Sequence, residues 1–257
     1  MIAGRVFAFW SLALYLFVIM VQIRRGRQGK TKIEIRRITA LDAIDEAIGR
    51  ATEMGRPVHF SPGVGDISAG QSDVLAGMEI LAHVAKRCAE MSTDLIASAS
   101  SAATYAVADE VVKTSLAQAG HPERYRTESV RFLSPDQWAY AAGVVGIITM
   151  EKVAANITIG AFQAETMLIA ESAHMAGAIQ VAGTTNMYQL PFFVAACDYT
   201  LLGEEMYAAG AYFSRDPIQL GIMSGEDFGK AFAVTLLVLG LVTATMKSPW
   251  LSNLIKK

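Results

Sequence analysis

The sequence predicts an α/β fold: a mostly parallel, Rossmann-like sheet with helices on both faces, flanked by transmembrane helices. Helix and strand patterns alternate regularly between residues 38 and 222. Long apolar runs lie near both ends of the chain, at 6–23 and 228–246. Of the 257 residues, 53% are hydrophobic and 18% are charged, whereas a typical globular domain has roughly 25% charged residues.

The first apolar run predicts a transmembrane anchor helix over residues 5–23. Its length approaches the ~20 residues that cross the hydrocarbon core of a bilayer, and it lacks the small-residue cleavage site of a signal peptide. A basic juxtamembrane segment, 24–37, follows it, whereas only Arg5 precedes it. By the positive-inside rule, we expect the chain after this helix to lie in the cytoplasm.

The second apolar run, 228–246, predicts a second transmembrane helix, with a short C-terminal tail at 247–257. Trp250 is placed where interfacial aromatic residues occur. The run contains glycine and threonine and is only just long enough to span a bilayer. A buried helix of a soluble domain is the alternative.

The middle of the chain, 38–222, is expected to form a cytoplasmic α/β domain. Its first helix is predicted to begin at a capping box made by Thr39 and Asp42. The helices are expected over 42–54, 73–91, 102–118, 136–146, 163–176 and 199–212. The strands are expected over 58–60, 94–100, 127–133, 156–162, 179–183 and 192–197. Residues 146–153 fit a strand or a continued helix equally well.

Two further helix starts carry capping signals. Ser134 is predicted to cap the helix at 136–146, with Pro135 in its first turn and Gln137 completing a capping box. Asp198 is predicted to cap the helix at 199–212. Helices and strands that alternate with short connections imply parallel strands joined by right-handed crossovers. The strands are short and apolar, as strands covered on both faces are.

Charged residues become scarce between Ser134 and Tyr212, where Lys152 is the single lysine or arginine. Segments such as AYAAGVVG and YAAGAY offer little to solvate on an outer helix face. We therefore expect this half of the domain to pack against other subunits, as a homo-oligomer, or against the lipid bilayer rather than to face water. The net charge of −2 argues against nucleic acid as a partner.

The glycine-rich segment VHFSPGVGDISAG, residues 58–70, has the outline of a phosphate-binding loop, since a strand ends in glycines and a helix follows. The dinucleotide motif needs Gly or Ala at position 68, which is Ser68, and a carboxylate at the end of the second strand. That strand ends in SASSA, without an acidic residue. The sequence therefore disfavours a dinucleotide site.

The same segment fails the P-loop pattern at its lysine, which is Gln71. A neutral amide does not supply the positive charge that this lysine brings to a phosphate, and Asp66 adds a negative charge to the loop. We expect a structural turn in which Ser68 caps the following helix and Gln71 closes a capping box. If the turn binds a ligand, that ligand is not expected to be a phosphate.

Small polar residues follow several predicted strands, in the loops at 61–68, 98–101 and 183–186. Because ligands of open α/β sheets bind at the carboxyl ends of the strands, these loops are candidates for a small-ligand site. Tight turns between strands and helices require the same residue types, which is the structural alternative. The candidate ligand-binding residues are Ser61, Gly63, Gly65, Asp66, Ser98, Thr184 and Asn186, with Ser100 in the same loops.

Other chemical signals are weaker. Glu171 and His174 have the Glu-x-x-His spacing of half a di-iron site, but a second such pair is missing, so a surface pair is expected. Glu165, Glu204 and Glu205 lie in otherwise apolar helices, where a buried carboxylate could have a raised pKa or hold a cation. Positions at helix starts or at subunit contacts explain them as well. No nucleophile motif such as G-x-S-x-G occurs. Cys88 and Cys197 are expected to be free, buried thiols. No catalytic residue, metal or cofactor is therefore expected.

Four segments resemble an uncharacterised prokaryotic family of membrane-anchored proteins, a domain of unknown function. They are residues 36–63, 160–165, 176–184 and 189–205, and the resemblance covers about 36–217. The resemblance implies a membrane protein with a cytoplasmic domain, in the inner or cytoplasmic membrane of a prokaryotic cell. It implies no activity, cofactor or catalytic residue.

The sequence thus favours a non-enzymatic function: a membrane-anchored cytoplasmic α/β domain that forms a homo-oligomeric scaffold or ring. One alternative is a small-ligand-binding or enzymatic domain that uses the loops at 61–68, 98–101 and 183–186. A second alternative is an accessory subunit of a transport or secretion complex.

Overall fold

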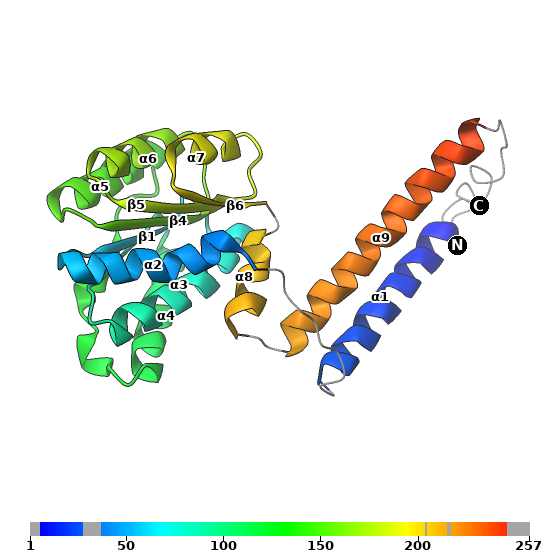
Figure 1. Ribbon diagram of the computed structural model, residues 1–257, viewed down its shortest axis with the longest axis horizontal. Coiled ribbons are helices and arrows are strands. Elements are labelled where there is room, and N and C mark those ends of the chain that lie inside the picture. The colour runs from blue at the N-terminus through cyan, green and yellow to red at the C-terminus, as the bar shows by residue number, and fades with distance from the viewer. Residues whose placement is uncertain (1–5, 28–36, 204, 215–216, 246–257) are drawn as a thin grey trace. The chain divides into compact units, whose positions relative to one another are not determined.

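The computed structural model describes residues 6–27, 37–203, 205–214 and 217–245. The chain divides into two compact units, Arg36–Phe213 and a second unit made by the two terminal segments. The first unit is an α/β domain and the second is a pair of helices, α1 and α9, coloured blue and orange in Figure 1.

The α/β unit is built on one six-stranded sheet with the order β3-β2-β1-β4-β5-β6. Every neighbouring pair of strands is parallel, which confirms the predicted parallel sheet, and this order is that of dinucleotide-binding Rossmann folds. The strands are β1 (Val58–Gly63), β2 (Leu95–Ala99), β3 (Val130–Phe132), β4 (Ala155–Ala161), β5 (Ile179–Thr184) and β6 (Tyr199–Leu202).

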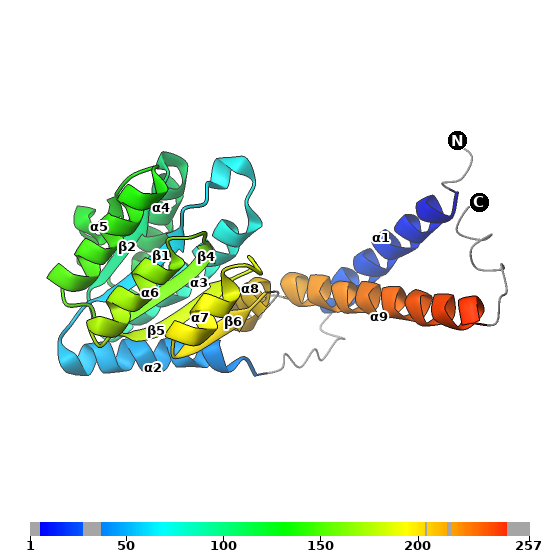
Figure 2. The same ribbon diagram turned by 90° about the horizontal axis from the view of Figure 1, so that it is seen from above.

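Helices cover both faces of the sheet (Figures 1 and 2). One face carries α2 (Thr39–Met54), α3 (Ser72–Glu90) and α4 (Ala102–Gln118). The opposite face carries α5 (Gln137–Met150), α6 (Thr166–Met175) and α7 (Leu190–Ala196). The helix α8 (Glu205–Ser214) follows β6. Short 3-10 turns are present at η1 (Ile67–Ala69), η2 (Pro122–Arg124) and η3 (Thr127–Ser129).

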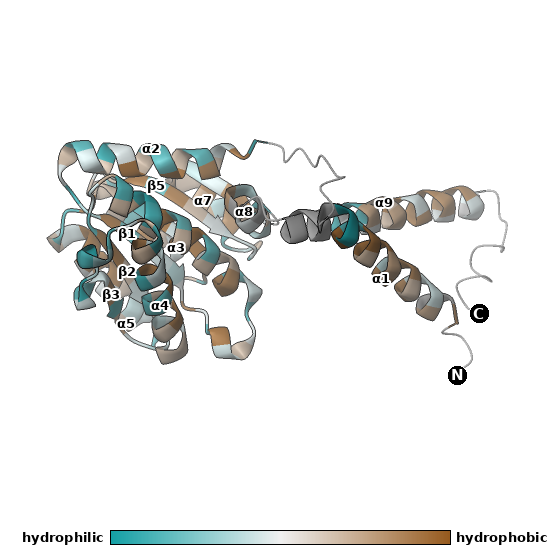
Figure 3. Cartoon of the chain, turned by 90° about the horizontal axis from the view of Figure 1, so that it is seen from below, coloured by the Kyte–Doolittle hydropathy of each residue, from teal (hydrophilic) through white to brown (hydrophobic). Residues whose placement is uncertain are grey.

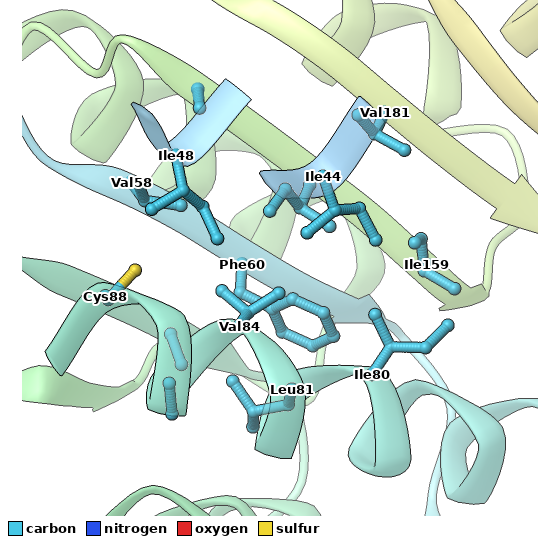
Figure 4. Close-up of a cluster of buried hydrophobic side chains, with 14 of the residues drawn as sticks. Ile44, Ile48, Val58, Phe60, Ile80, Leu81, Val84, Cys88, Ile159 and Val181 are labelled. Carbon is cyan, nitrogen blue, oxygen red and sulfur yellow. The ribbon is translucent and has the colours of Figure 1, made fainter. Parts of the chain in front are cut away.

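The larger hydrophobic core lies between the sheet and the α2–α4 layer (Figure 4). Ile44 and Ile48 of α2 and Leu81 of α3 are fully buried there, against Phe60 and Ile157 of the two central strands. Burial of one such side chain contributes about 1.5–3 kcal/mol to folding. These helices are amphipathic, because their outer faces carry the exposed charged residues Glu46, Arg50, Glu53, Lys86 and Lys113.

The predicted start of the first helix is wrong in its capping. Ile38 is the N-cap of α2 and no side chain caps it, so Thr39 and Asp42 form no capping box. Asp42 instead accepts hydrogen bonds from Arg37 and from Tyr212 of α8. The Asp42 carboxylate thus makes tertiary contacts, whereas the sequence pattern predicts that it caps the start of α2.

The prediction is also wrong between 190 and 205, where helix and strand are exchanged. Residues 192–197 form most of α7, which begins with Pro191 in its first turn, and proline favours a helix start. Residues 199–202 form β6 rather than a helix. Asp198 therefore caps no helix, and its Oδ2 accepts a hydrogen bond from the backbone N–H of Gln180 at 2.8 Å.

At α5 the cap is Asp136 and not Ser134, since Asp136 Oδ1 accepts hydrogen bonds from the N–H groups of Trp138 and Ala139 at 3.0 and 2.9 Å. Ser134 Oγ accepts from the N–H of Asp136. The segment at 146–153, which the pattern left open, continues α5 as a helix through Met150.

In the second unit, α1 (Val6–Arg27) packs against α9 (Pro217–Thr245). Two glycines of α9, four residues apart, allow the close approach: a Cβ on Gly225 would lie 2.8 Å from Ile19 Cγ1, and one on Gly229 would lie 2.6 Å from Tyr15 Cε2. This is the small-xxx-small packing that apolar helix pairs use. Hydrophobic residues dominate the coloured parts of both helices in Figure 3.

Among the described residues, no helix is both long enough and apolar enough to cross a membrane. The transmembrane character expected of 5–23 and 228–246 is therefore not supported by the fold. Most of the basic segment predicted at 24–37 and all of the tail predicted at 247–257 lie outside the described residues.

Candidate functional site

The crevice at the carboxyl end of the central strands is the position where open α/β sheets bind ligands. Strand β1 lies between β2 and β4, so the strand order reverses between β1 and β4, and ligands settle at such a switch point. A cavity of about 330 Å³ lies there. It is lined by the loops that follow β1, β4 and β5: Val64, Gly65, Gly70, Gln71, Ser72, Asp73, Ala161, Phe162, Gln163 and Asn186.

The glycines of the first loop are explained by contacts within the chain. Gly63 has a φ of +82°, and a Cβ there would lie 2.0 Å from the carbonyl oxygen of Ala161. A Cβ on Gly65 would lie 2.3 Å from Val74 Cγ2. The ends of β1 and β4 therefore touch through their backbones at Gly63, and the loop after β1 packs against α3 at Gly65. Both close contacts require glycine, so contacts within the chain, and not contact with a phosphate, account for the glycine-rich pattern.

Hydrogen bonds hold the turn after β1 in place. Asp66 caps η1 by accepting from the N–H of Ser68 at 2.8 Å, and these hydrogen bonds from Ser68 lower the pKa of the Asp66 carboxyl. Gln71 Oε1 accepts from the N–H of Asp66 at 3.0 Å. The prediction that Ser68 caps the following helix is therefore wrong, since its N–H donates to the capping residue Asp66. The predicted capping box of Gln71 is also wrong, because the N-cap position of α3 has no side-chain hydrogen bond.

The first turn of α3 carries its own anion. Asp73 accepts hydrogen bonds from the hydroxyl groups of Thr185, after β5, and Tyr207, in α8. A carboxylate is stabilised at a helix N-terminus. It occupies the end of the helix that would attract a phosphate. Among the described residues that line the cavity are Asp73 and no lysine or arginine. This lining disfavours an anionic ligand and offers hydrogen-bonding partners to hydroxyl or amide groups.

Two predicted residues, Ser61 and Ser98, lie beneath the crevice in a buried polar network. Ser61 Oγ and Ser98 Oγ lie 2.7 and 2.9 Å from Tyr140 Oη of α5. His59 Nε2 lies 3.2 Å from Ser98 Oγ, and its Nδ1 lies 2.8 Å from Asn156 Oδ1. All five side chains are fully buried, so they order the sheet against α5 and are closed to solvent.

Burial sets the charge state of this network. Desolvation, only partly opposed by the hydrogen bond to Asn156, lowers the pKa of His59 to about 4. Desolvation likewise raises the pKa of Tyr140 to about 12. Both groups are therefore neutral at pH 7. Asn156 Nδ2 and Thr158 Oγ1 are buried without a hydrogen-bond partner among the described residues.

The remaining predicted residues tie the loops together. Ser100 Oγ donates to the carbonyl oxygen of Gly63 at 3.1 Å. Thr184 Oγ1, which is buried, accepts from the N–H of Asn186 at 3.3 Å, and Asn186 Nδ2 donates to the carbonyl oxygen of Phe162 at 3.0 Å. Of the seven ligand-binding candidates, Gly65 and Asn186 line the crevice. Sequence reasoning missed Asp73 and the residues after β4.

The other carboxylates flagged in the sequence have structural partners or lie on the surface. Glu165 is fully buried and accepts hydrogen bonds from Gln137 Nε2 at 2.6 Å and from the N–H of Gln163 at 2.9 Å. Glu205 Oε2 accepts from the N–H of Leu202, and Glu204 lies outside the described residues. Glu171 and His174 are exposed.

The described part of the chain contains neither a metal-binding cluster nor a reactive thiol. No group of three or more His, Cys, Asp or Glu side chains there is arranged to hold a metal ion. Both cysteines are free, and desolvation raises the pKa of each thiol to about 12. Thiols of this kind are poor nucleophiles.

The model of a protein family described as "Domain of unknown function (DUF6754)" matches residues 2–255. No curated protein and no solved structure matches the chain.

Proposed function

Since the chain belongs to the DUF6754 family, a domain of unknown function, we propose a function from its surfaces: a membrane-attached α/β domain that self-assembles into a homo-oligomeric scaffold. One observation carries the proposal. The α5–α7 layer exposes large apolar side chains where the α2–α4 layer exposes charged ones.

The exposed apolar residues of α5, α6 and α7, together with those of the loop before α7, make up what we call the assembly face. Met175 is 80% exposed and Tyr188 is 85% exposed. Monomeric proteins rarely expose large contiguous apolar surface, and such surface marks interaction sites. The assembly face comprises Trp138, Met150, Met167, Leu168, Met175, Met187, Tyr188, Phe192 and Val194.

A second copy of this chain is the occupant that we assign to the assembly face. The α6 helix carries Glu171 and His174 on its exposed side, and the face offers few charges that would specify a differently charged partner. An apolar patch that meets its own copy about a two-fold axis is self-complementary. Attachment to a membrane would favour the contact further, because it holds the copies in one plane at high effective concentration.

Membrane attachment is proposed through the α1–α9 pair. Trp10 is 65% exposed, and Leu237 and Leu241 are 73% and 70% exposed. Exposure of apolar side chains to water costs about 25 cal/mol per Å², and contact with lipid removes that cost. Arg24 and Arg25, exposed near the end of α1, favour a cytoplasmic location for the chain that follows. We therefore propose that the α/β domain lies on the cytoplasmic face of a membrane, and the resemblance noted in the sequence favours that of a prokaryotic cell.

Self-assembly is tested by the mass of the full-length protein in mild detergent. We expect a protein mass several times the 27.6 kDa of one chain, measured by light scattering with the detergent contribution subtracted. Leu168→Glu combined with Val194→Glu, both on the assembly face, should yield monomers. Leu75→Glu is the matched control, since Leu75 is 50% exposed on α3 in the opposite layer. A monodisperse monomer for the unchanged chain would contradict self-assembly, and a stoichiometric foreign protein in the particle would favour an accessory-subunit role.

Attachment to the membrane is tested separately, by alkaline carbonate extraction of membranes from cells that make the protein. We expect the full-length chain to stay in the membrane pellet. Recovery of the chain in the carbonate supernatant would contradict attachment through α1 and α9, whatever its oligomeric state.

The crevice favours small-ligand binding as a second candidate function. Its position at the switch point and its polar lining by Gln71, Gln163 and Asn186 support this candidate. We expect uncharged polyols or amides to raise the melting temperature of the full-length protein. Gln163→Ala should abolish the shift, whereas Gln118→Ala, at an exposed position at the end of α4, should keep it. A screen of such compounds without any shift would remove this candidate.

A further inference from the structure

A second cavity lies at the opposite edge of the sheet, where the strands begin. Its volume is about 410 Å³. Pro57, just before β1, and Leu95 and Ile96, at the start of β2, form part of its lining. The cavity is thus separate from the crevice at the carboxyl edge.

Four arginines line this cavity: Arg56 before β1, Arg131 in β3, and Arg124 and Arg126, which lie two residues apart between α4 and β3. Three carboxylates line it as well, Asp94, Glu128 and Glu151, so the lining has a surplus of one positive charge. Several guanidinium groups that line one cavity form the kind of site that binds anions.

Two of the arginines already have partners within the protein. Arg56 donates from Nη2 to the carbonyl oxygens of Val153 and Ala176 at 3.0 and 3.3 Å. Arg131 Nη1 forms an ion pair with Glu151 at 2.9 Å. These two side chains are therefore positioned by the fold before any ligand arrives.

The other two arginines lie near the same carboxylate, that of Asp94, but neither forms a hydrogen bond with it. Arg124 Nη2 lies 3.8 Å from Asp94 Oδ1, and Arg126 Nη1 lies 3.8 Å from Asp94 Oδ2. Both distances exceed the length of a hydrogen bond. The two guanidinium groups therefore keep donors that an anion with several oxygens could accept from.

The deeper wall of the cavity is apolar. Ala51 of α2, Cys88 of α3 and Val112 and Leu116 of α4 line it, and all four side chains are buried. A ligand that fits both parts has a charged end for the arginines and an apolar body for this wall.

We propose that this cavity binds a small organic phosphate, whose phosphate group accepts hydrogen bonds from Arg124 and Arg126 while its apolar body contacts Val112 and Leu116. A phosphate monoester presents three terminal oxygens, enough to accept from two guanidinium groups at once, whereas a single carboxylate has two. Planar guanidinium groups bind phosphate through paired hydrogen bonds. The Asp94 carboxylate then competes with the ligand for the same donors.

The test is calorimetric titration of the full-length protein with phenyl phosphate, a monoester with an apolar ring. We expect binding that is tighter than that of inorganic phosphate and of benzoate. Arg124→Gln should raise the Kd about tenfold or more, since each charge-assisted hydrogen bond contributes of that order. Asp94→Asn should lower the Kd, because it removes the competing charge.

Arg50→Gln is the matched control, since it removes one positive charge from an exposed position on α2 outside the cavity, and it should leave the Kd unchanged. Thermal unfolding of each variant shows that it is folded. Equal binding of benzoate, or a Kd unchanged by both Arg124→Gln and Asp94→Asn, would overturn the proposal. Absence of heat with phenyl phosphate in the unchanged protein would do the same.

Discussion

Tyr140 Oη lies 2.7 Å from Ser61 Oγ, and both side chains are fully buried. The contact joins α5 to β1 through a hydrogen bond. Ser98 on β2 accepts or donates the next bond of the chain, at 2.9 Å from the same hydroxyl. One phenol therefore connects a helix to two adjacent strands.

Removal of that hydroxyl should destabilise the fold. Tyr140→Phe leaves Ser61 and Ser98 with unmet hydrogen-bonding capacity in the core, which costs about 1–3 kcal/mol. For a domain of this size that loss lowers the melting temperature by about 2–4 °C per kcal/mol. Tyr207→Phe, at an exposed phenol, should change it much less. Thermal unfolding by circular dichroism checks the difference, and equal melting temperatures for Tyr140→Phe and the unchanged protein would contradict the role of the network.

Glycine at position 63 should be indispensable, whereas glycine at position 55 should not. A Cβ on Gly63 would lie 2.0 Å from a backbone oxygen, at a φ of +82°. Gly55, with a φ of +61°, has open space around it. Gly55→Ala should therefore cost about 1 kcal/mol, the conformational term alone, and Gly63→Ala several times more. The free energies of unfolding in urea check this, and similar losses would show that the loops separate without cost.

The stability of the protein should fall below neutral pH because of His59. Its pKa is about 4 in the folded state, against 6.5 as its ordinary value, so the unfolded state binds the proton more readily. The stabilising contribution is fully present above pH 6.5 and is lost as the pH falls from 6.5 to 4. A shift of this size corresponds to about 3 kcal/mol.

His59→Gln should flatten the dependence of the melting temperature on pH between 4 and 6.5. His174→Gln, at an exposed histidine on α6, should leave the dependence in place. If the melting temperature of His59→Gln depends on pH as steeply as that of the unchanged protein, groups other than His59 cause the dependence.

Asp198 should matter through its acceptor oxygen rather than through its charge. Its Oδ2 accepts from the N–H of Gln180 at the start of β5. Asp198→Ala leaves that donor without its partner and should cost about 1–3 kcal/mol. Asp198→Asn keeps a carbonyl oxygen and should cost less. Equal losses in chemical denaturation would indicate that the charge, and not the hydrogen bond, is what counts.

Elements with local boundary signals were predicted well from the sequence. The helix expected over 102–118 has those bounds as α4, because Ser101 caps its start and Gly120 lies just beyond its end. The exchange of helix and strand around α7 and β6 has a physical reason. A short apolar run such as FFVAAC has the composition of a buried strand, and Pro191 is the one local signal for a helix.

The sequence does not reveal that the polar residues of the central strands are buried. His59 and Ser61 alternate with Phe60 on β1, and Asn156 and Thr158 alternate with Ile157 on β4, while all are buried. Buried alternation in a parallel sheet looks, in the sequence, like a strand with one solvated face. Strand order was likewise beyond the sequence, because pairing depends on where each crossover helix packs. Hence the loop after β4 was not recognised as part of the crevice.

The two glycines of α9 have a consequence for how the helix pair resists separation. Side chains of α1 lie directly against the α9 backbone at Gly225 and Gly229. The two helices therefore interlock at these positions and do not slide freely along each other. Such interlocking fixes the rotation of each helix about its own axis as well as the distance between the two helices. The apolar side chains that point outward are therefore always the same ones, and the pair presents a constant outer surface to its surroundings.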